Sequence, residues 1–493
     1  MDFKAVLAGY VQAFNSGDMD ADSEKRFIPN SKALEWMLEN VPLIDLPDKV
    51  IERAYYFRWW SFRKHIRKTE DGFVISEFLK DVPWAGKHNT ISCAAGHHIY
   101  EGRWIKDPKY LDDYINFWLN GGGSLRSYSF WAADSVYKRY LVNGDIGLIE
   151  RHFAALATNY SAWEQEHGDE NGLFWQIDDR EGMELSMAGA GHRPNINSYM
   201  YADARALSEM AALLGLCDIA KDFDKKAKNI KTLMLKTLWD KEAQFFKTYV
   251  SEKHQQIQLN SYKNNTTDAY TNQPLGLSPV EELYGYTPWY YGVMDDVSDS
   301  EYQQAWRFIV DPDYFAGPAG LATAPIKHPD FQRFHHHECA WDGPSWPYAT
   351  CQALGAMAKL LRNNDKTPVS TKDYMNLVHQ YAAAHKLGER DWIDENFDPI
   401  TGEWLARKRL YEWDDPNKDR GQYYNHSSFC DLVISDVIGL QVNADGFYVK
   451  PLATDFPYFA LIGVNVQGRV IDIYYDKDGS RYGKGAGLNL FSN

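Results

Sequence analysis

The stretch SYMYADARALSEMAALLGLCDIAKDFDKKAKNIKTLMLKTL, residues 198–238, carries the clearest helical pattern of the chain. In its second half, apolar residues recur at spacings of three and four, the spacing of one helix face: Ile219, Phe223, Ala227, Ile230, Met234 and Leu238. Its first half has a similar apolar face and stops near Gly215, a residue type common after helix ends. The two halves therefore predict a helical hairpin, with Asp218 as the N-cap of the second helix.

The same pattern extends outward from this hairpin in both directions. Further helices are predicted at residues 49–68, 109–119, 130–141, 148–164, 345–361 and 373–387. Long connections rich in Gly, Pro, Trp, Asp and His join them, and an all-helical barrel places its active site in such loops. We therefore expect a mainly α protein with its site at one end of a ring of helices.

The pattern changes after about residue 442. Segments 447–449, 459–462 and 470–474 are typical of short strands, and Asp476–Gly479 is typical of a turn. We predict a barrel domain over residues 1–441 and a small β module over residues 442–493 that packs on it.

Composition limits the possible partners. The chain has 493 residues, is 44% hydrophobic and 24% charged, and carries a formal net charge of −16, which is typical of a folded acidic protein. Nucleic acid and anionic lipid are therefore not expected as partners. No run spans a bilayer and no signal peptide is visible in residues 1–15, so we expect a cytoplasmic protein or a secreted or periplasmic one whose signal is already removed. The oligomeric state is left open.

Aromatic residues are abundant, with 17 Trp, 32 Tyr and 24 Phe. Rigid rings cover the apolar faces of sugars, and they also fill large cores. Both uses can hold here: a neutral or cationic small molecule fits the acidic chain, and the rings would suit a small carbohydrate.

Two stretches concentrate carboxylates among aromatic residues. The first is WQIDDREGMELS, residues 175–186, which places four acids and an Arg within seven residues and suits a carboxyl group with a shifted pKa. A solvated acidic loop explains it equally well. The second is WIDENFDPITGEW, residues 392–404, where a turn would present Glu395 between aromatic walls, although on its own this is also a simple turn after a helix.

A third stretch is HHHECAWDGPSWPY, residues 335–348. Three His and one Glu suggest a metal, but adjacent His residues point in different directions and no zinc-binding spacing is present. We expect no metal in the chemistry and no cofactor. The WDGPSW part is better interpreted as aromatic walls with one carboxylate that bind a sugar.

Seven short motifs occur in a recognisable order over about residues 50 to 440: GMELS (182–186), NSY (197–199), LWD (238–240), TPW (287–289), GLAT (320–323), WDGPSW (341–346) and ENFDPITG (395–402). The ordered set resembles the inverting glycoside hydrolases of the trehalase and processing α-glucosidase clan, families 37 and 63, and the bacterial mannosylglycerate hydrolases. The family 142 β-L-arabinofuranosidases look similar too. The resemblance implies an (α/α)6 barrel and hydrolysis of a glycosidic bond.

The resemblance also implies roles for particular residues. It assigns the general acid to Glu184 and the general base to Glu395, which would sit about 6.5–9.5 Å apart in an inverting enzyme. The group usually has Asp where this chain has Glu184, so Asp179 and Glu181 remain rival acids. Many processing glucosidases carry Arg where this chain has Asp342, which leaves the sugar open.

Further residues are expected to bind the substrate. Candidate aromatic walls are Phe130, Tyr286, Trp289, Trp341 and Trp346, and candidate ligands for sugar hydroxyls are Arg126, Asp179, Arg193, Asn197 and Asp342. The predicted function is exo-hydrolysis of an α-linked glucose- or mannose-type sugar. The alternatives are a β-L-arabinofuranosidase, a polysaccharide lyase that uses residues 423–426, a phosphorylase, and a non-catalytic carbohydrate-binding protein.

Overall fold

Three of the helices that surround the centre of the molecule have a proline in their first turn. α8 (Pro194–Leu213), α12 (Thr287–Tyr290) and α14 (Pro347–Asn363) each have Pro at one of their first two positions. The first backbone N–H groups of a helix have no partner within it, so Pro costs nothing there and fixes the start of the helix. Each loop before these helices therefore ends at a defined point.

The computed structural model describes residues 2–261, 274–297, 299–364 and 366–492. Within these residues, consecutive packing contacts close an inner ring of helices: α4 (Ala95–Gly102), α6 (Ala132–Asn143), α8, α12, α14 and α17 (Cys430–Leu432), the last returning to α4. A π-helical turn over Val433–Val437 continues α17. The inner helices are buried along most of their length, as expected for elements covered on all sides.

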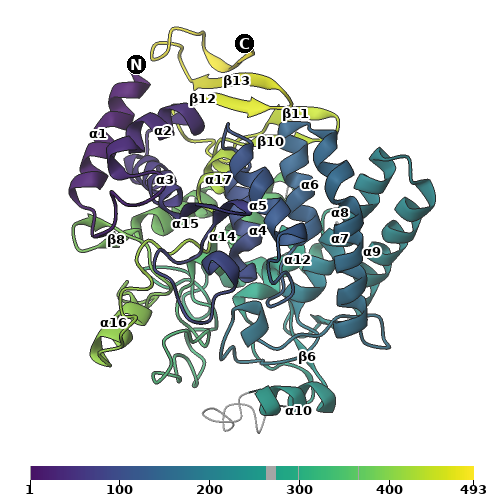
Figure 1. The fold of residues 1–493 in the computed structure, drawn as a ribbon. Helices are drawn as coiled ribbons and strands as arrows, with labels where there is room; N and C mark the ends of the chain where they lie inside the picture. Colours follow the sequence, from purple (N-terminus) through teal and green to yellow (C-terminus); the bar gives the residue numbers. More distant parts are fainter. Residues whose placement is uncertain (1, 262–273, 298, 365, 493) are drawn as a thin grey trace.

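An outer helix alternates with each inner one along the chain. The outer elements are α3 (Lys49–Phe62), α5 (Lys109–Asn120), α7 (Ile146–His167), α9 (Cys217–Thr237), the 3-10 helix Gln304–Val310 and α15 (Thr371–Ala383). α1 (Phe3–Ser16) packs on α3 from outside, and α2 (Ala33–Asn40) packs beside it. The arrangement is the predicted (α/α)6 barrel (Figure 1).

A four-stranded antiparallel sheet covers one end of the barrel (Figure 1). Its order is β1 (Leu43–Asp45), β12 (Tyr458–Val466), β13 (Arg469–Asp476) and β14 (Gly487–Ser492), so a strand from near the N-terminus completes it. Ile471 and Ile473 are fully buried and belong to the same core as the helices. The predicted boundary between residues 441 and 442 falls inside β10 (Leu440–Asn443), which pairs with β11 (Gly446–Val449), and it stays a prediction.

Three details of the predicted helices are wrong. The helix predicted over residues 373–387 ends at Ala383, because residues 386–387 form a short strand that pairs with residues 390–391. The helix predicted over residues 49–68 ends at Phe62, because residues 63–65 form a 3-10 turn and β2 (Ile66–Thr69) pairs with β3 (Gly72–Ile75). Asp218 does not cap α9, which has Leu216 at its N-cap; Asp218 lies in the first turn, where a negative charge favours the helix dipole.

Among the described residues, the α-helices and strand pairs not yet named are short. They are α10 (Glu252–Ser261), α13 (Ser300–Gln303), α16 (Leu405–Glu412) and the strand pairs β4–β5 (Trp239–Asp240, Phe245–Phe246), β6–β7 (Tyr249–Val250, Gly276–Leu277) and β8–β9 (Lys386–Leu387, Arg390–Asp391). In the part of the chain that the structure describes, no helix is long and apolar enough to cross a membrane.

Candidate active site

A cavity of about 360 Å³ opens at the barrel end where the inner helices begin. Its walls come mainly from the loops that precede those helices: Ile91 and Cys93 before α4, Tyr128 before α6, Asp179, Arg180, Gly182 and Glu184 before α8, residues 337–339 with Trp341 and Trp346 before α14, and Arg420, Tyr424 and His426 before α17. Helix N-termini carry partial positive charge, which favours the carboxylates that gather there. The sheet of β12 and β13 lies at the opposite end (Figure 1).

Glu184 reaches this cavity from a tight loop between α7 and α8. Gly182 has φ +67°, and Leu185 has φ +58°, a conformation that costs a residue with a Cβ about 1–2 kcal/mol. Leu185 is fully buried against Ala340, and the backbone N–H of Trp341 donates to the carbonyl of Glu184 at 2.9 Å. Packing and this hydrogen bond hold the strained turn, and they bind the loop of Glu184 to the WDGPSW loop.

The surroundings of Glu184 favour its protonated form. Burial raises the pKa of this carboxyl well above its usual range, and the nearby charge of Asp179 raises it further. This environment favours the form of the carboxyl group that can donate a proton.

Glu395 lies in the same cavity in a different environment. Its side chain is buried, and Arg420 donates to both carboxylate oxygens, from Nε at 2.7 Å and from Nη2 at 3.3 Å. The thiol of Cys339 donates to Oε2 at 3.2 Å. A two-pronged ion pair of this kind stabilises the ionised carboxylate and fixes its direction.

Two indole rings form one wall of the cavity. Trp341 and Trp346 stack with ring centroids 4.6 Å apart and an angle of 14° between their planes. Trp346 Nε1 donates to the carbonyl of Ala340 at 3.1 Å, which fixes the ring. A flat aromatic surface beside the carboxyl groups suits the apolar face of a sugar.

The structure brings together Glu184, Glu395, Asp179, Trp341 and Trp346 of the residues predicted from the sequence. Glu181, a rival acid, lies beneath the loop instead. It is fully buried and forms an ion pair with Arg193 Nε, which places its carboxyl outside the cavity lining.

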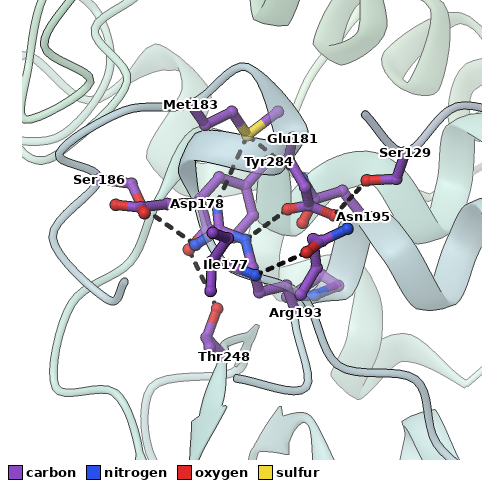
Figure 2. A network of polar contacts seen from close by, with 12 residues as sticks. Ser129, Ile177, Asp178, Glu181, Met183, Ser186, Arg193, Asn195, Thr248 and Tyr284 are labelled. Carbon is purple, nitrogen blue, oxygen red and sulfur yellow. Dashed lines mark hydrogen bonds and ion pairs between the residues drawn. The ribbon is translucent and has the colours of Figure 1, made fainter. Parts of the chain in front are cut away.

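Arg193 contacts the loop of Glu184 through Glu181 and Ser186 (Figure 2). It does not line the cavity. Its guanidinium pairs with Glu181, donates to Ser186 Oγ at 3.0 Å and to the carbonyl of Gly189 at 2.5 Å, and lies over the ring of Tyr284 at 4.5 Å. Arg193 is therefore placed to position the loop rather than to bind a sugar hydroxyl.

Six other predicted ligands also lie outside the cavity lining: Arg126, Phe130, Asn197, Tyr286, Trp289 and Asp342. Phe130, Tyr286 and Trp289 are core rings, and the amide of Asn197 bonds to backbone groups of Phe174 and Arg193. Asp342 is buried and accepts from the backbone N–H of Phe334 at 2.8 Å, whereas Arg126 pairs with Glu166 at the surface. Their direct contact with a sugar stays a prediction that this arrangement does not support.

Two charged residues of the cavity escaped sequence reasoning, Glu77 and Arg420. Glu77 is fully buried, and burial raises its pKa to about 8; its carboxylate accepts from Tyr424 Oη. A Glu inside the apolar run that follows β3 was the available signal. No comparable signal in the sequence points to Arg420, because its partner Glu395 lies 25 residues away along the chain.

Side chains of the types that bind metals gather at two places outside the cavity lining. Within the described residues, two groups of His and carboxylate side chains bring their ligand atoms together: Asp169 with His192 and His254, and Glu70 with Asp71 and His88. Of the run at 335–337, His335 and His336 are exposed and His337 lines the cavity.

A barrel of helix pairs with two unlike carboxyl groups in a small aromatic pocket is the architecture of an (α/α)-barrel glycoside hydrolase. The model of the mannosylglycerate hydrolase MGH1-like glycoside hydrolase domain matches residues 87–427, and the chain belongs to this family.

Solved structures agree with the fold. One described as a sialidase is 37% identical with a TM-score of 0.89, and the match covers 99% of this chain and 43% of that one. This chain therefore spans less than half the length of that protein. The α-L-rhamnosidase of Streptomyces avermitilis, solved with L-rhamnose, is 10% identical with a TM-score of 0.52 over 92% of this chain and 37% of its own. At that identity the likeness concerns the fold alone.

Proposed function

We propose that this protein is an exo-acting, inverting glycosidase in which Glu184 is the general acid and Glu395 the general base. One observation carries the proposal: a single cavity holds one carboxyl group whose surroundings favour its protonated form and one that forms a two-pronged ion pair with an arginine. Two titratable groups with opposed environments are the usual basis for an acid–base assignment.

The chemistry then follows in one displacement. Glu184 donates its proton to the glycosidic oxygen as the bond to the anomeric carbon breaks, and Glu395 takes a proton from the water that attacks the opposite face. Glu184 ends as a carboxylate and Glu395 as an acid, so a proton returns between them through solvent before the next turnover. The expected separation of the two carboxyl groups is about 6.5–9.5 Å, which leaves room for the water.

The size of the cavity supports exo action. Its volume of about 360 Å³ is near the lower end of the range for small-molecule sites, which suits a terminal sugar better than the interior of a long chain. The stacked pair Trp341 and Trp346 would contact that sugar.

The charge of the lining favours a neutral sugar. Glu77, Asp179, Glu184, Glu338 and Glu395 all face the cavity. Of the two arginines in the lining, Arg420 is engaged by Glu338 and Glu395, and Arg180 is half exposed and pairs with Asp179 at 3.3 Å. An anionic sugar such as a sialic acid would meet a lining rich in carboxyl groups, whose two arginines are already paired with acidic side chains. For a glyceryl carboxylate, as in a mannosylglycerate, Arg180 is the cationic side chain of the lining that could still form an ion pair.

The sugar hypothesis is therefore an α-linked glucose- or mannose-type residue, with a β-L-arabinofuranoside as the alternative that the sequence resemblance leaves open. A panel of neutral and anionic disaccharides and aryl glycosides, followed by NMR, tests both. We expect one neutral substrate class to release a single terminal monosaccharide. An unsaturated uronate, a phosphate-dependent sugar phosphate, or ligand binding without turnover across the panel would contradict the proposal, because each belongs to a lyase, a phosphorylase or a binding protein.

A further inference from the structure

α10 is attached to the barrel mainly through polar groups. Its two fully buried side chains are His254 and Gln258, one helical turn apart, while Leu259 is partly buried against Leu185 and Ala340. Gln258 Nε2 donates to Asp178 Oδ1 at 2.6 Å, at the start of the loop that carries Glu184. The helix therefore lies against this loop with little apolar area to hold it there.

His254 meets two residues from other segments. Asp169 Oδ2 lies 3.0 Å from His254 Nε2 and 2.9 Å from His192 Nε2. Asp169 follows the end of α7, and His192 lies in the bridge to Tyr249 directly before Arg193. Three separate segments thus converge on one carboxylate oxygen at the base of the Glu184 loop.

We propose that Asp169, His192 and His254 form a structural site for a divalent transition metal, with Zn²⁺ as the expected ion. Two imidazoles and a carboxylate are a ligand set that zinc accepts, and the three ligand atoms lie within 4.8 Å of one another. Zinc bonds of about 2.0–2.1 Å need each of the two histidine nitrogens only a few tenths of an ångström further from Asp169 Oδ2 than it is here.

Both imidazoles are suited to ligation. Their Nδ1 atoms are buried and make no hydrogen bond among the described residues, so Asp169 is the side chain that orients both rings. Burial lowers the pKa of both imidazoles, which favours the neutral form of each ring. Binding places the ion on the Nε2 lone pairs and the ring protons on Nδ1.

The carboxylate gives the ion a route from solvent. Asp169 is partly exposed, and Lys253 pairs with its other oxygen, Oδ1. The side chain of Lys253 is 56% exposed and lies near the face of Trp175, so it can move away as the ion enters. A water completes a tetrahedral coordination sphere.

The ion would act on the reaction only through position. It would join α7, the segment before Arg193 and α10, and each of the last two contacts the loop that presents Glu184, through Arg193 to Glu181 and through Gln258 to Asp178. The ion would thus hold α10 against the barrel, where the helix has few apolar contacts of its own.

Metal binding to the full chain, produced without a histidine tag and stripped with a chelator that is then removed, tests the site directly. We expect one equivalent of Zn²⁺ by calorimetry and elemental analysis, the visible absorption of a four-coordinate site with Co²⁺, and a higher melting temperature with Zn²⁺. His254→Gln and Asp169→Asn should each weaken Zn²⁺ binding by about 100-fold or more, beyond the loss typical of changes around the ligands.

His88→Gln is the matched control, because His88 belongs to the other group of His and carboxylate side chains. It should keep the full equivalent. Absence of Zn²⁺ binding in the wild type, unchanged binding in His254→Gln, or loss of binding in His88→Gln would each overturn the proposal. If His254→Gln does not fold by circular dichroism, Asp169→Asn and the Co²⁺ spectrum of the wild type decide the question.

Discussion

Glu184 and Glu395 differ in what surrounds them, and this difference predicts the effect of removing either. Glu184→Gln and Glu395→Gln should each lower kcat by about 10²–10⁴-fold on a substrate with a poor leaving group, the usual contribution of one acid–base group. Circular dichroism should show the fold retained. Glu166→Gln, which alters an ion pair with Arg126 outside the cavity lining, is the control and should keep near wild-type activity. Near wild-type turnover in either cavity variant would remove that residue from its role.

The pH dependence of the rate follows from the charge next to Glu184. A general acid works only while protonated, so kcat/KM should fall as pH rises through the pKa of Glu184, which burial and Asp179 hold well above its usual range. Asp179→Asn removes the negative charge, lowers that pKa, and should move the alkaline limb to lower pH. An alkaline limb that stays in place, measured against Glu166→Gln, would show that Asp179 does not act on the acid.

At this scale the sequence leads to two carboxyl groups that share a cavity, whose catalytic roles stay a prediction, and it describes their neighbours poorly. Glu184 and Glu395 follow from ordered motifs, and the structure brings both into one cavity. Arg193 and Asn197, predicted to bind substrate, are instead buried in hydrogen bonds that shape the loop. A sequence shows which polar residues lie near a site but not which way they face.

At the scale of elements, the loop of Glu184 depends on Arg193. Arg193→Ala should leave the buried carboxyl group of Glu181 without its partner and destabilise the protein by about 3–5 kcal/mol in urea unfolding. Because the loop loses its anchor, kcat should fall more than KM rises. Arg193→Lys should be intermediate, since an ammonium cannot reproduce the forked contacts.

Arg126→Ala is the matched control for this prediction. Its pair with Glu166 is partly exposed, so its loss should change stability by about 1 kcal/mol or less. Equal unfolding midpoints and equal kcat in Arg193→Ala and wild type would contradict the positioning role.

Helix periodicity predicts where most of the long helices lie but not all of their ends. The predicted second helix of the hairpin matches α9 closely, since its apolar face is clear. The helix predicted over 49–68 runs six residues too far, because the apolar and basic residues after Phe62 suit a 3-10 turn and a strand as well as a helix. The short α4, α10 and α16 carry too few turns for a period to be visible.

At the scale of the whole molecule, the sheet over the closed end belongs to the hydrophobic core of the barrel. Ile473 of β13 is fully buried in that core, so Ile473→Ala should cost about 2–5 kcal/mol in urea unfolding. Leu490 of β14 is 45% exposed, and Leu490→Ala should change stability by about 0.5 kcal/mol or less. Equal effects of the two substitutions would mean that the sheet folds without support from the barrel.

The sequence predicts the barrel and the strand pattern of residues 447–474, while β1 joins the sheet through a pairing across more than 400 residues, which no local pattern reveals. The choice of sugar substrate depends in the same way on side chains from several loops, which come together only in the folded barrel. The fold and the family can therefore be predicted from the sequence, whereas the identity of the substrate cannot.

The stereochemistry of hydrolysis tests the central claim most directly. Rapid NMR on a substrate found in the glycoside panel records which anomer forms first, before mutarotation mixes the two. A single displacement by water, with Glu184 as acid and Glu395 as base, predicts that the first product has the inverted anomeric configuration. Retention, together with a covalent glycosyl-enzyme intermediate, would contradict it, because a retaining pair stands only about 5–5.5 Å apart and leaves no room for the water.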